Sequence, residues 1–261
     1  MMAEVYRVLK PRGTAWINLG DTYGTRSGNF NAGNQIDNKI KYVGGIENYT
    51  KPDNYHKCLL LLPHRFAIGC IDRGWIMRND IVWAKRNGMP ESVTDRFSKK
   101  HEFIFFMAKN EKYYFDLDNI RDKQSAVTIK RYDYGWNGNE DRNYVNGPQN
   151  NMNRYLGDPK KKKEAIEKGK NPGSVSDFWD ITTKPSSEEH YAAYNDELIG
   201  KPIVAGCPHG GVILDPFCGT ATTGCRALEL GRNFIGFDGS KKYVAIANKR
   251  IVPYLAQKQL F

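Results

Sequence analysis

Residues 212–238 constrain the fold of this chain more than any other part of the sequence. They predict a short buried strand at 212–214, a sharp turn, a helix from about Thr222, and a second strand at 233–237 that leads to Asp238. Such a unit brings a ligand to the carboxyl ends of parallel strands, and an acid about 20 residues past the turn is placed to bind ribose hydroxyls. On spacing alone, an ordinary βαβ unit with a tight turn fits equally well.

The composition favours a polyanionic partner. The 261 residues include 39 Lys and Arg against 29 Asp and Glu, a formal net charge of +10. Cationic side chains bind nucleic-acid phosphates and release counterions. Because 40% of the residues are hydrophobic and 12% are aromatic, the chain can bury a core. Its length fits one large domain, or one domain with an insertion.

Cysteines and histidines do not point to disulfide or zinc chemistry. The five cysteines have no paired spacing and are expected to be reduced thiols of a cytoplasmic protein. The five histidines form no His-Glu-x-x-His motif, and no Cys-x-x-Cys pair occurs, so no metal is expected. The first residues are charged, unlike a signal peptide, and the longest aliphatic run, 59–62, is too short to cross a membrane.

The first half of the chain alternates between regular elements and long loops. Residues 4–13 resemble the last turns of a helix, which suggests that an N-terminal segment is missing, and 14–21 predict a strand that runs into a turn. Residues 22–56 are rich in Gly, Asn, Asp and Tyr and predict a long loop. A helix is expected from Pro63 to Gly74.

Two strands are expected next, at 78–85 and 102–109, joined by a loop dense in groups that can bond bases or phosphates. From 121 to 176 apolar periodicity disappears and Lys, Arg, Asn, Gly and Tyr dominate. This region is either a solvated insertion or a target-recognition region that meets bases and phosphates.

The last part of the chain returns to regular structure. Order resumes at 178–181, a helix is expected over 188–205 with interruptions at Gly200 and Pro202, and a closing helix is expected over 241–256. The chain is therefore divided into a catalytic-side half (1–120), a basic target-recognition insertion (121–176) and a cofactor-binding half (177–261).

The turn after residue 214 carries a family resemblance. Its sequence, Asp-Pro-Phe-Cys-Gly-Thr-Ala-Thr-Thr, resembles the S-adenosylmethionine loop of the amino-group DNA methyltransferases, which methylate N4 of cytosine or N6 of adenine. Their usual form is Asp-Pro-Phe-x-Gly-Ser-Gly-Thr-Thr. Thr220 keeps the hydroxyl of the Ser, whereas Ala221 adds a methyl group where glycine would tolerate a positive φ or close approach to the cofactor. We expect mildly weaker cofactor affinity and an intact fold.

Other blocks extend the resemblance over most of the chain. Residues 18–23 resemble the strand end that borders the target-base pocket, and 81–96 resemble a block of phage and bacterial members. Residues 177–181 and 190–194 resemble the segment whose helix borders the cofactor, although the family usually has Pro at Asn195. The block order matches the permuted β group. The resemblance implies a Rossmann-like α/β fold with a mixed, mostly parallel sheet, in an enzyme of a phage or a bacterial restriction-modification system.

The resemblance also implies site residues. Cofactor-binding positions are Asp215, Pro216, Phe217, Gly219, Thr220, Thr222, Thr223, Asp238 and His190. Base-pocket candidates are Asn18 and Asp21, and DNA-binding candidates are Arg86, Arg96, Lys99, Lys100, Lys160, Lys161, Lys162 and Lys163. The substrate that these assignments imply is a base flipped out of double-stranded DNA.

One family element is absent. The catalytic signature Ser/Asp-Pro-Pro-Tyr, whose groups accept hydrogen bonds from the base amine and stack on the flipped base, occurs nowhere in the 261 residues. In the family its strand lies between those of Leu214 and Ile17, so its loss predicts missing strands and a gap in the sheet. A truncated enzyme and a split or degenerate enzyme both explain this, and either predicts no methyl transfer by the chain alone.

Two functions of other classes compete with this one. A DNA-binding protein without catalysis would keep the basic insertion and a relict cofactor fold, and Ala221 favours it. A nicotinamide-dependent oxidoreductase needs Gly-x-Gly-x-x-Gly at the first turn, and the middle glycine is absent from 219–224. The target sequence, the choice between cytosine and adenine, and the oligomeric state are not encoded in any recognisable motif.

Overall fold

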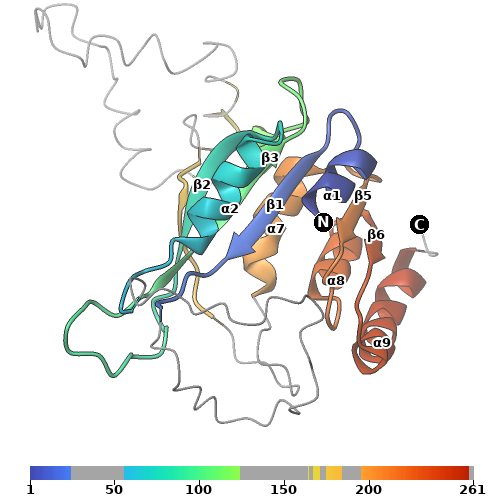
Figure 1. Cartoon of the computed structure of the whole chain (residues 1–261). Coiled ribbons are helices and arrows are strands. Elements are labelled where there is room, and N and C mark those ends of the chain that lie inside the picture. The colour runs from blue at the N-terminus through green and yellow to red at the C-terminus, as the bar shows by residue number, and fades with distance from the viewer. Residues whose placement is uncertain (25–55, 124–163, 165–166, 171–174, 184–194, 259–261) are drawn as a thin grey trace, which may run out of the picture.

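The computed structural model of the chain describes residues 1–24, 56–123, 164, 167–170, 175–183 and 195–258 (Figure 1). Most of the expected insertion, with Lys160, Lys161, Lys162 and Lys163, lies outside the described residues, and so does His190.

A four-stranded sheet forms the larger part of the described structure. Its strands are β1 (Thr14–Leu19), β2 (Ile76–Ala84), β3 (His101–Ala108) and β4 (Phe178–Asp180), in the order β1-β3-β2-β4. β3 runs antiparallel to β1 and β2, whereas β4 runs parallel to β2. The sheet is therefore mixed, and the expected strands at 14–21, 78–85 and 102–109 are present with shifts of one or two residues at their ends.

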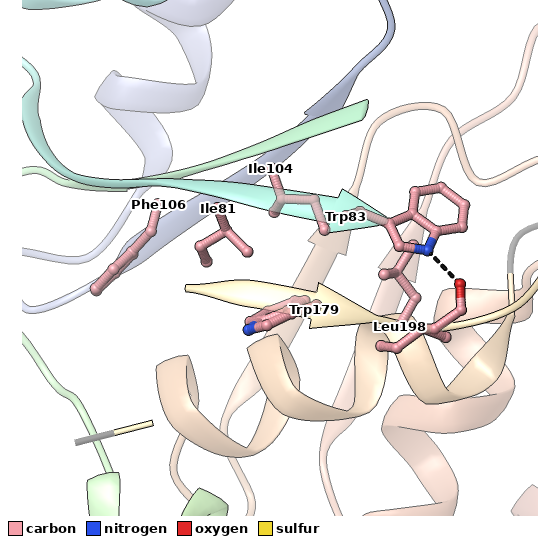
Figure 2. Packing of buried hydrophobic residues seen from close by; sticks show 7 residues of the cluster. Ile81, Trp83, Ile104, Phe106, Trp179 and Leu198 are labelled. Carbon is pink, nitrogen blue, oxygen red and sulfur yellow. Dashed lines mark hydrogen bonds between the residues drawn. The ribbon is translucent and has the colours of Figure 1, made fainter. Parts of the chain in front are cut away.

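Helices cover both faces of this sheet. On one face, α1 (Met2–Val8) and α2 (Leu62–Ile71) pack over a cluster of buried residues that includes Phe105 and Met107. On the other face, α7 (Asp196–Gly206) contributes Leu198 to a cluster with Trp83 and Trp179 (Figure 2). The indole N–H of Trp83 donates to the carbonyl of Ile181 at 2.7 Å, which satisfies its polar atom in the core.

α7 differs from the helix expected over 188–205. It begins at Asp196, because Asn195 is extended and its side chain accepts a hydrogen bond from the N–H of Glu197. Pro202 lies within the continuous helix and does not interrupt it. Asn195 therefore takes the capping role, for which its short side-chain carbonyl is well suited, and the expected start and interruptions were wrong.

A two-stranded parallel sheet and two helices form the second unit. β5 (Val212–Asp215) pairs with β6 (Asn233–Gly236), with α8 (Thr222–Glu229) between them in the chain and α9 (Lys241–Lys258) after them. α8 packs against both strands, and a Cβ at Gly224 would come within 2.6 Å of the Phe234 ring. The strand–turn–helix–strand unit expected over 212–238 is confirmed.

The two sheets are separate. β1 is the edge strand of the larger sheet and β5 pairs only with β6 among the described strands. A short helix, α3 (Leu117–Ile120), completes the described elements that position the site. Among the helices within the described ranges, none is long and apolar enough to cross a membrane.

Candidate cofactor and base site

Asp215 anchors the turn that follows β5. Its Oδ1 accepts the backbone N–H of Phe217 at 3.0 Å, and its Oδ2 accepts the hydroxyl of Thr223 at 2.6 Å. The first bond closes the tight turn after the strand, and the second ties the turn to the first turn of α8. Both bonds are charge-assisted, so the carboxylate sets the shape of the loop.

Asp238 lies at the same end of the small sheet. Asp215 is paired in register with Gly236, two residues before Asp238. The Oδ2 of Asp238 accepts the N–H of Gly219 at 3.0 Å, and its Oδ1 accepts the N–H of Ser240 at 2.7 Å. The turn after β5 and the acid after β6 are therefore joined by one hydrogen bond, as the ligand-binding interpretation requires.

Ala221 adopts the left-handed conformation, with φ 62° and ψ 41°, and its side chain is fully buried. It is the N-cap of α8 and supplies no side-chain cap. The substitution noted in the sequence therefore falls where a Cβ is strained, because only glycine adopts this conformation without cost.

The hydroxyls of Thr220 and Thr222 face α9. Arg250 donates from Nη1 to the carbonyl of Thr220 at 2.9 Å and to its hydroxyl at 2.7 Å, with a longer contact of 3.4 Å to the Thr222 hydroxyl. Sequence reasoning missed Arg250, since no motif links a residue of the closing helix to the loop. Through these contacts Arg250 connects the turn after β5 to α9.

Two aromatic side chains near the turn are exposed. Phe217 follows Asp215 by two residues, and Phe237 immediately precedes Asp238; they are 70% and 60% exposed. Their backbones meet through the hydrogen bond from Cys218 N–H to Phe237 O at 2.9 Å. Burial raises the pKa of the Cys218 thiol, and the nearby carboxylates of Asp215 and Asp238 raise it further, so this cysteine is an unreactive packing residue.

A polar group surrounds the carboxyl end of β1. Asn18 donates from Nδ2 to the carbonyl of Phe103 at 3.1 Å. Asp21 accepts the N–H of Leu62 at Oδ1, at 3.1 Å, and so holds the start of α2. The ammonium of Lys99 bonds the Asp21 carbonyl, and burial lowers the pKa of Lys99. Glu102 packs against Gly20, so its ion pair with Lys85 lies beside the carboxyl end of β1.

The expected DNA-binding cations of the 86–101 loop also make intramolecular contacts. Arg86 pairs with Asp180 at the end of β4, and Lys100 bonds the carbonyl of Gly88. Arg96 pairs with Glu91 and stacks over the Tyr23 ring, 3.9 Å from its centroid. The hydrogen bond from Arg96 lowers the pKa of Glu91. The structure thus brings Lys99 to Asp21 and Arg96 to Tyr23, and Tyr23 was not singled out as a site residue in the sequence.

A separate open cavity of about 540 Å³ is lined by Arg12, Glu111, Lys112, Tyr113 and Phe115, none of which was expected at the site. In the part of the chain that the structure describes, no group of three His, Cys, Asp or Glu residues could hold a metal ion.

Solved structures share this fold over nearly the whole chain. The structure of the PvuII DNA methyltransferase (cytosine-N4-specific) matches 94% of this chain and 66% of its own, with 15% identity and a TM-score of 0.57. The M1.HpyAVI–SAM complex matches 96% of this chain and 79% of its own, with 17% identity and a TM-score of 0.52. Together with the β5–β6 turn, these likenesses define a Rossmann-like α/β fold of the methyltransferase class.

Sequence comparison gives the family. Residues 1–249 match the N6/N4 methyltransferase family, described as DNA methylase, and the chain belongs to this family. The Type II methyltransferase M.SmaI of Serratia marcescens is 31% identical over 255 residues, covering 97% of this chain and 72% of the relative. The Type II methyltransferase M.Cfr9I of Citrobacter freundii is 31% identical over 255 residues, covering 96% and 69%. The expected family is confirmed.

Proposed function

We propose that the chain binds S-adenosylmethionine at the β5–β6 turn and serves the transfer of its methyl group to N4 of cytosine or N6 of adenine in double-stranded DNA. Family membership and the Type II methyltransferase relatives support the reaction class. The observation that carries the cofactor site is the hydrogen bond from Gly219 to Asp238, which joins both acidic positions at one end of two parallel strands.

The residues of the turn fit a nucleoside cofactor. Each Asp238 oxygen accepts one backbone N–H, and a carboxylate has about four acceptor sites, so ribose hydroxyls can be bound as well. The exposed rings of Phe217 and Phe237 offer stacking surfaces for an adenine ring. Bound S-adenosylmethionine would supply a methyl group activated by its sulfonium.

The acceptor base belongs at the carboxyl end of β1. An exocyclic amine is a weak nucleophile, so it needs hydrogen-bond acceptors in a pocket that holds the flipped base. Asn18 and Asp21 border this place, and Lys99 and Glu102 supply charge around it. The Pro-Pro-Tyr signature that does this work in the family does not occur in the 261 residues. We therefore propose that this chain binds the cofactor but does not transfer methyl groups alone.

Titration calorimetry with S-adenosylmethionine, combined with tritium transfer to mixed-sequence DNA, tests the proposal. Asp238→Asn should weaken cofactor binding by roughly 10- to 100-fold, since a charged hydrogen-bond acceptor contributes about 1.5–3 kcal/mol. Asp72→Asn, an exposed change at the end of α2, is the matched control and should leave affinity unchanged. Equal affinities of the two variants would contradict the cofactor site, and robust transfer by the chain alone would contradict the second proposal.

A DNA-binding protein without catalysis is the second candidate, and the strained Ala221 favours it. It predicts salt-dependent DNA binding with no S-adenosylmethionine affinity, so the same calorimetry separates the two. For either function the partner is DNA and the proposed location is the cytoplasm of a bacterial or phage-infected cell, where such DNA lies.

A further inference from the structure

The guanidinium of Arg250, on α9, is committed to the turn after β5. Its Nη1 donates to the carbonyl of Thr220 at 2.9 Å and to the Thr220 hydroxyl at 2.7 Å, with a 3.4 Å contact to the Thr222 hydroxyl. Within the part of the chain that the structure describes, no carboxylate pairs with this guanidinium. A charged donor forms stronger hydrogen bonds than a neutral one, so Arg250 holds these neutral oxygens firmly.

The carbonyl that Arg250 holds lies directly before a strained residue. Ala221 is left-handed, with φ 62° and ψ 41°, and its side chain is fully buried. Glycine adopts this conformation freely, whereas the Cβ of alanine crowds the following carbonyl oxygen. The Thr220 carbonyl belongs to the peptide unit that joins Thr220 to Ala221, and the orientation of that unit is set in part by the φ angle of Ala221. A hydrogen bond that fixes this carbonyl therefore also restrains Ala221.

A closed set of contacts joins Arg250 to Ala221. The N–H of Cys225 donates to the Ala221 carbonyl at 2.9 Å, and the Cys225 thiol donates to the Arg250 carbonyl at 3.7 Å. The main chain of Arg250 thus contacts the first turn of α8, while its side chain reaches the residue before Ala221. On the β6 side of the turn, the N–H of Gly219 donates to Asp238. The turn is therefore held by a carboxylate after β6 and by a guanidinium of α9.

We propose that Arg250 is a positioning residue for cofactor binding. It holds the peptide unit before Ala221, so the turn keeps with an alanine the conformation that a glycine would adopt unaided. Arg250 acts through the turn, and the Thr220 hydroxyl receives Arg250 instead of a ligand. Replacement of Ala221 by glycine removes the strain that Arg250 opposes, so the contributions of these two residues are coupled. The inference rests on the proposed function, because this turn is the proposed S-adenosylmethionine site.

A double-mutant cycle on the full chain, read by calorimetry with S-adenosylmethionine, tests the proposal. Arg250→Met keeps an unbranched side chain and removes the donors. It should weaken cofactor binding by about tenfold or more in the natural chain, but by about threefold or less when combined with Ala221→Gly. Arg250→Lys keeps a charged donor and should recover much of the loss. Lys249→Met, an exposed change on the same helix, is the matched control and should leave the affinity unchanged.

Hydrogen exchange of residues 219–225, measured by mass spectrometry without ligand, is the second readout. Arg250→Met should speed this exchange by about tenfold, and by clearly less when Ala221→Gly is also present. If Arg250→Met does not fold, Arg250→Lys takes its place, with the same coupling expected at smaller size.

An equal effect of the Arg250 change with and without Ala221→Gly, in either measurement, would overturn the inference, because Arg250 would then only support the packing of α9 on α8. Unchanged cofactor affinity of Arg250→Met would overturn it as well. If the natural chain binds no S-adenosylmethionine, the proposed function fails, and the exchange measurement alone decides whether Arg250 holds the turn.

Discussion

The two sheets of this protein bury their apolar faces to different extents. In the four-stranded sheet, helices cover both faces, and Trp83, Phe105 and Met107 are at most 3% exposed. In the β5–β6 sheet, one face packs on α8 and the other leaves Leu214 and Ile235 partly exposed. Polar contacts show the reverse pattern. In the small sheet, both carboxylate oxygens of Asp215 and of Asp238 accept hydrogen bonds from the turns that follow β5 and β6.

The difference shows that the hydrogen-bonded turn after β5 and the hydrophobic burial that stabilises the fold reside in different sheets. The turn after β5, where we propose that the cofactor binds, is shaped by hydrogen bonds among a few residues, so its shape does not depend on burial of the second face of the small sheet. Hydrophobic stabilisation, in contrast, follows the apolar area removed from water, and β5 removes little on its bare face. Most of the folding free energy is therefore expected to come from the larger sheet, and ligand recognition from the smaller one.

The largest contrast is expected between truncation of a buried side chain in the larger sheet and of a partly exposed one in the smaller sheet. Trp83→Ala should destabilise the chain by about 3–5 kcal/mol, because it leaves a cavity in the cluster of Figure 2 and removes the partner of the Ile181 carbonyl. Leu214→Ala should cost about 1 kcal/mol, since that side chain is already partly solvated. Urea denaturation followed by tryptophan fluorescence and circular dichroism measures both.

Equal destabilisation by Leu214→Ala and Trp83→Ala would contradict the difference in burial between the two sheets. That result would mean that β5 is covered in solution.

A smaller effect is expected within the cofactor turn. Thr223→Val keeps the shape of the side chain but removes the 2.6 Å hydrogen bond to Asp215. Loss of this hydrogen bond should lower the free energy of unfolding by about 1–2 kcal/mol. We expect it to reduce the free energy of S-adenosylmethionine binding by more than that. Thr94→Val is the control, because Thr94 is an exposed threonine outside this turn. Calorimetry and thermal unfolding of both variants separate the two effects, and indistinguishable affinities would mean that Asp215 does not need this anchor.

Local sequence patterns predicted the helices and strands well, but they could not predict contacts between residues that are distant in the sequence. The strand–turn–helix–strand unit, the Pro63 helix start and the apolar run of β3 follow from period and turn chemistry, so they were expected. The start of α7 was misplaced because Asn195 acts through a cap whose geometry no period reveals. Arg250 and the Lys85–Glu102 pair depend on tertiary packing and carry no motif. The assigned roles of Asn18, Asp21 and the basic residues stay predictions.

The smallest expected effect concerns the strain at Ala221. Ala221→Gly removes the cost of a left-handed alanine, about 1–2 kcal/mol, but loses a buried methyl group, about 0.8 kcal/mol. A net gain of about 0.5 kcal/mol follows, with slightly tighter cofactor binding. Ala227→Gly is the matched control, since Ala227 is equally buried in the same helix with helical geometry, and it should destabilise by about 1–2 kcal/mol. If both glycine variants lose stability equally in thermal unfolding, the left-handed turn is not strained, and the β5–β6 unit departs from the larger sheet only in its bare face.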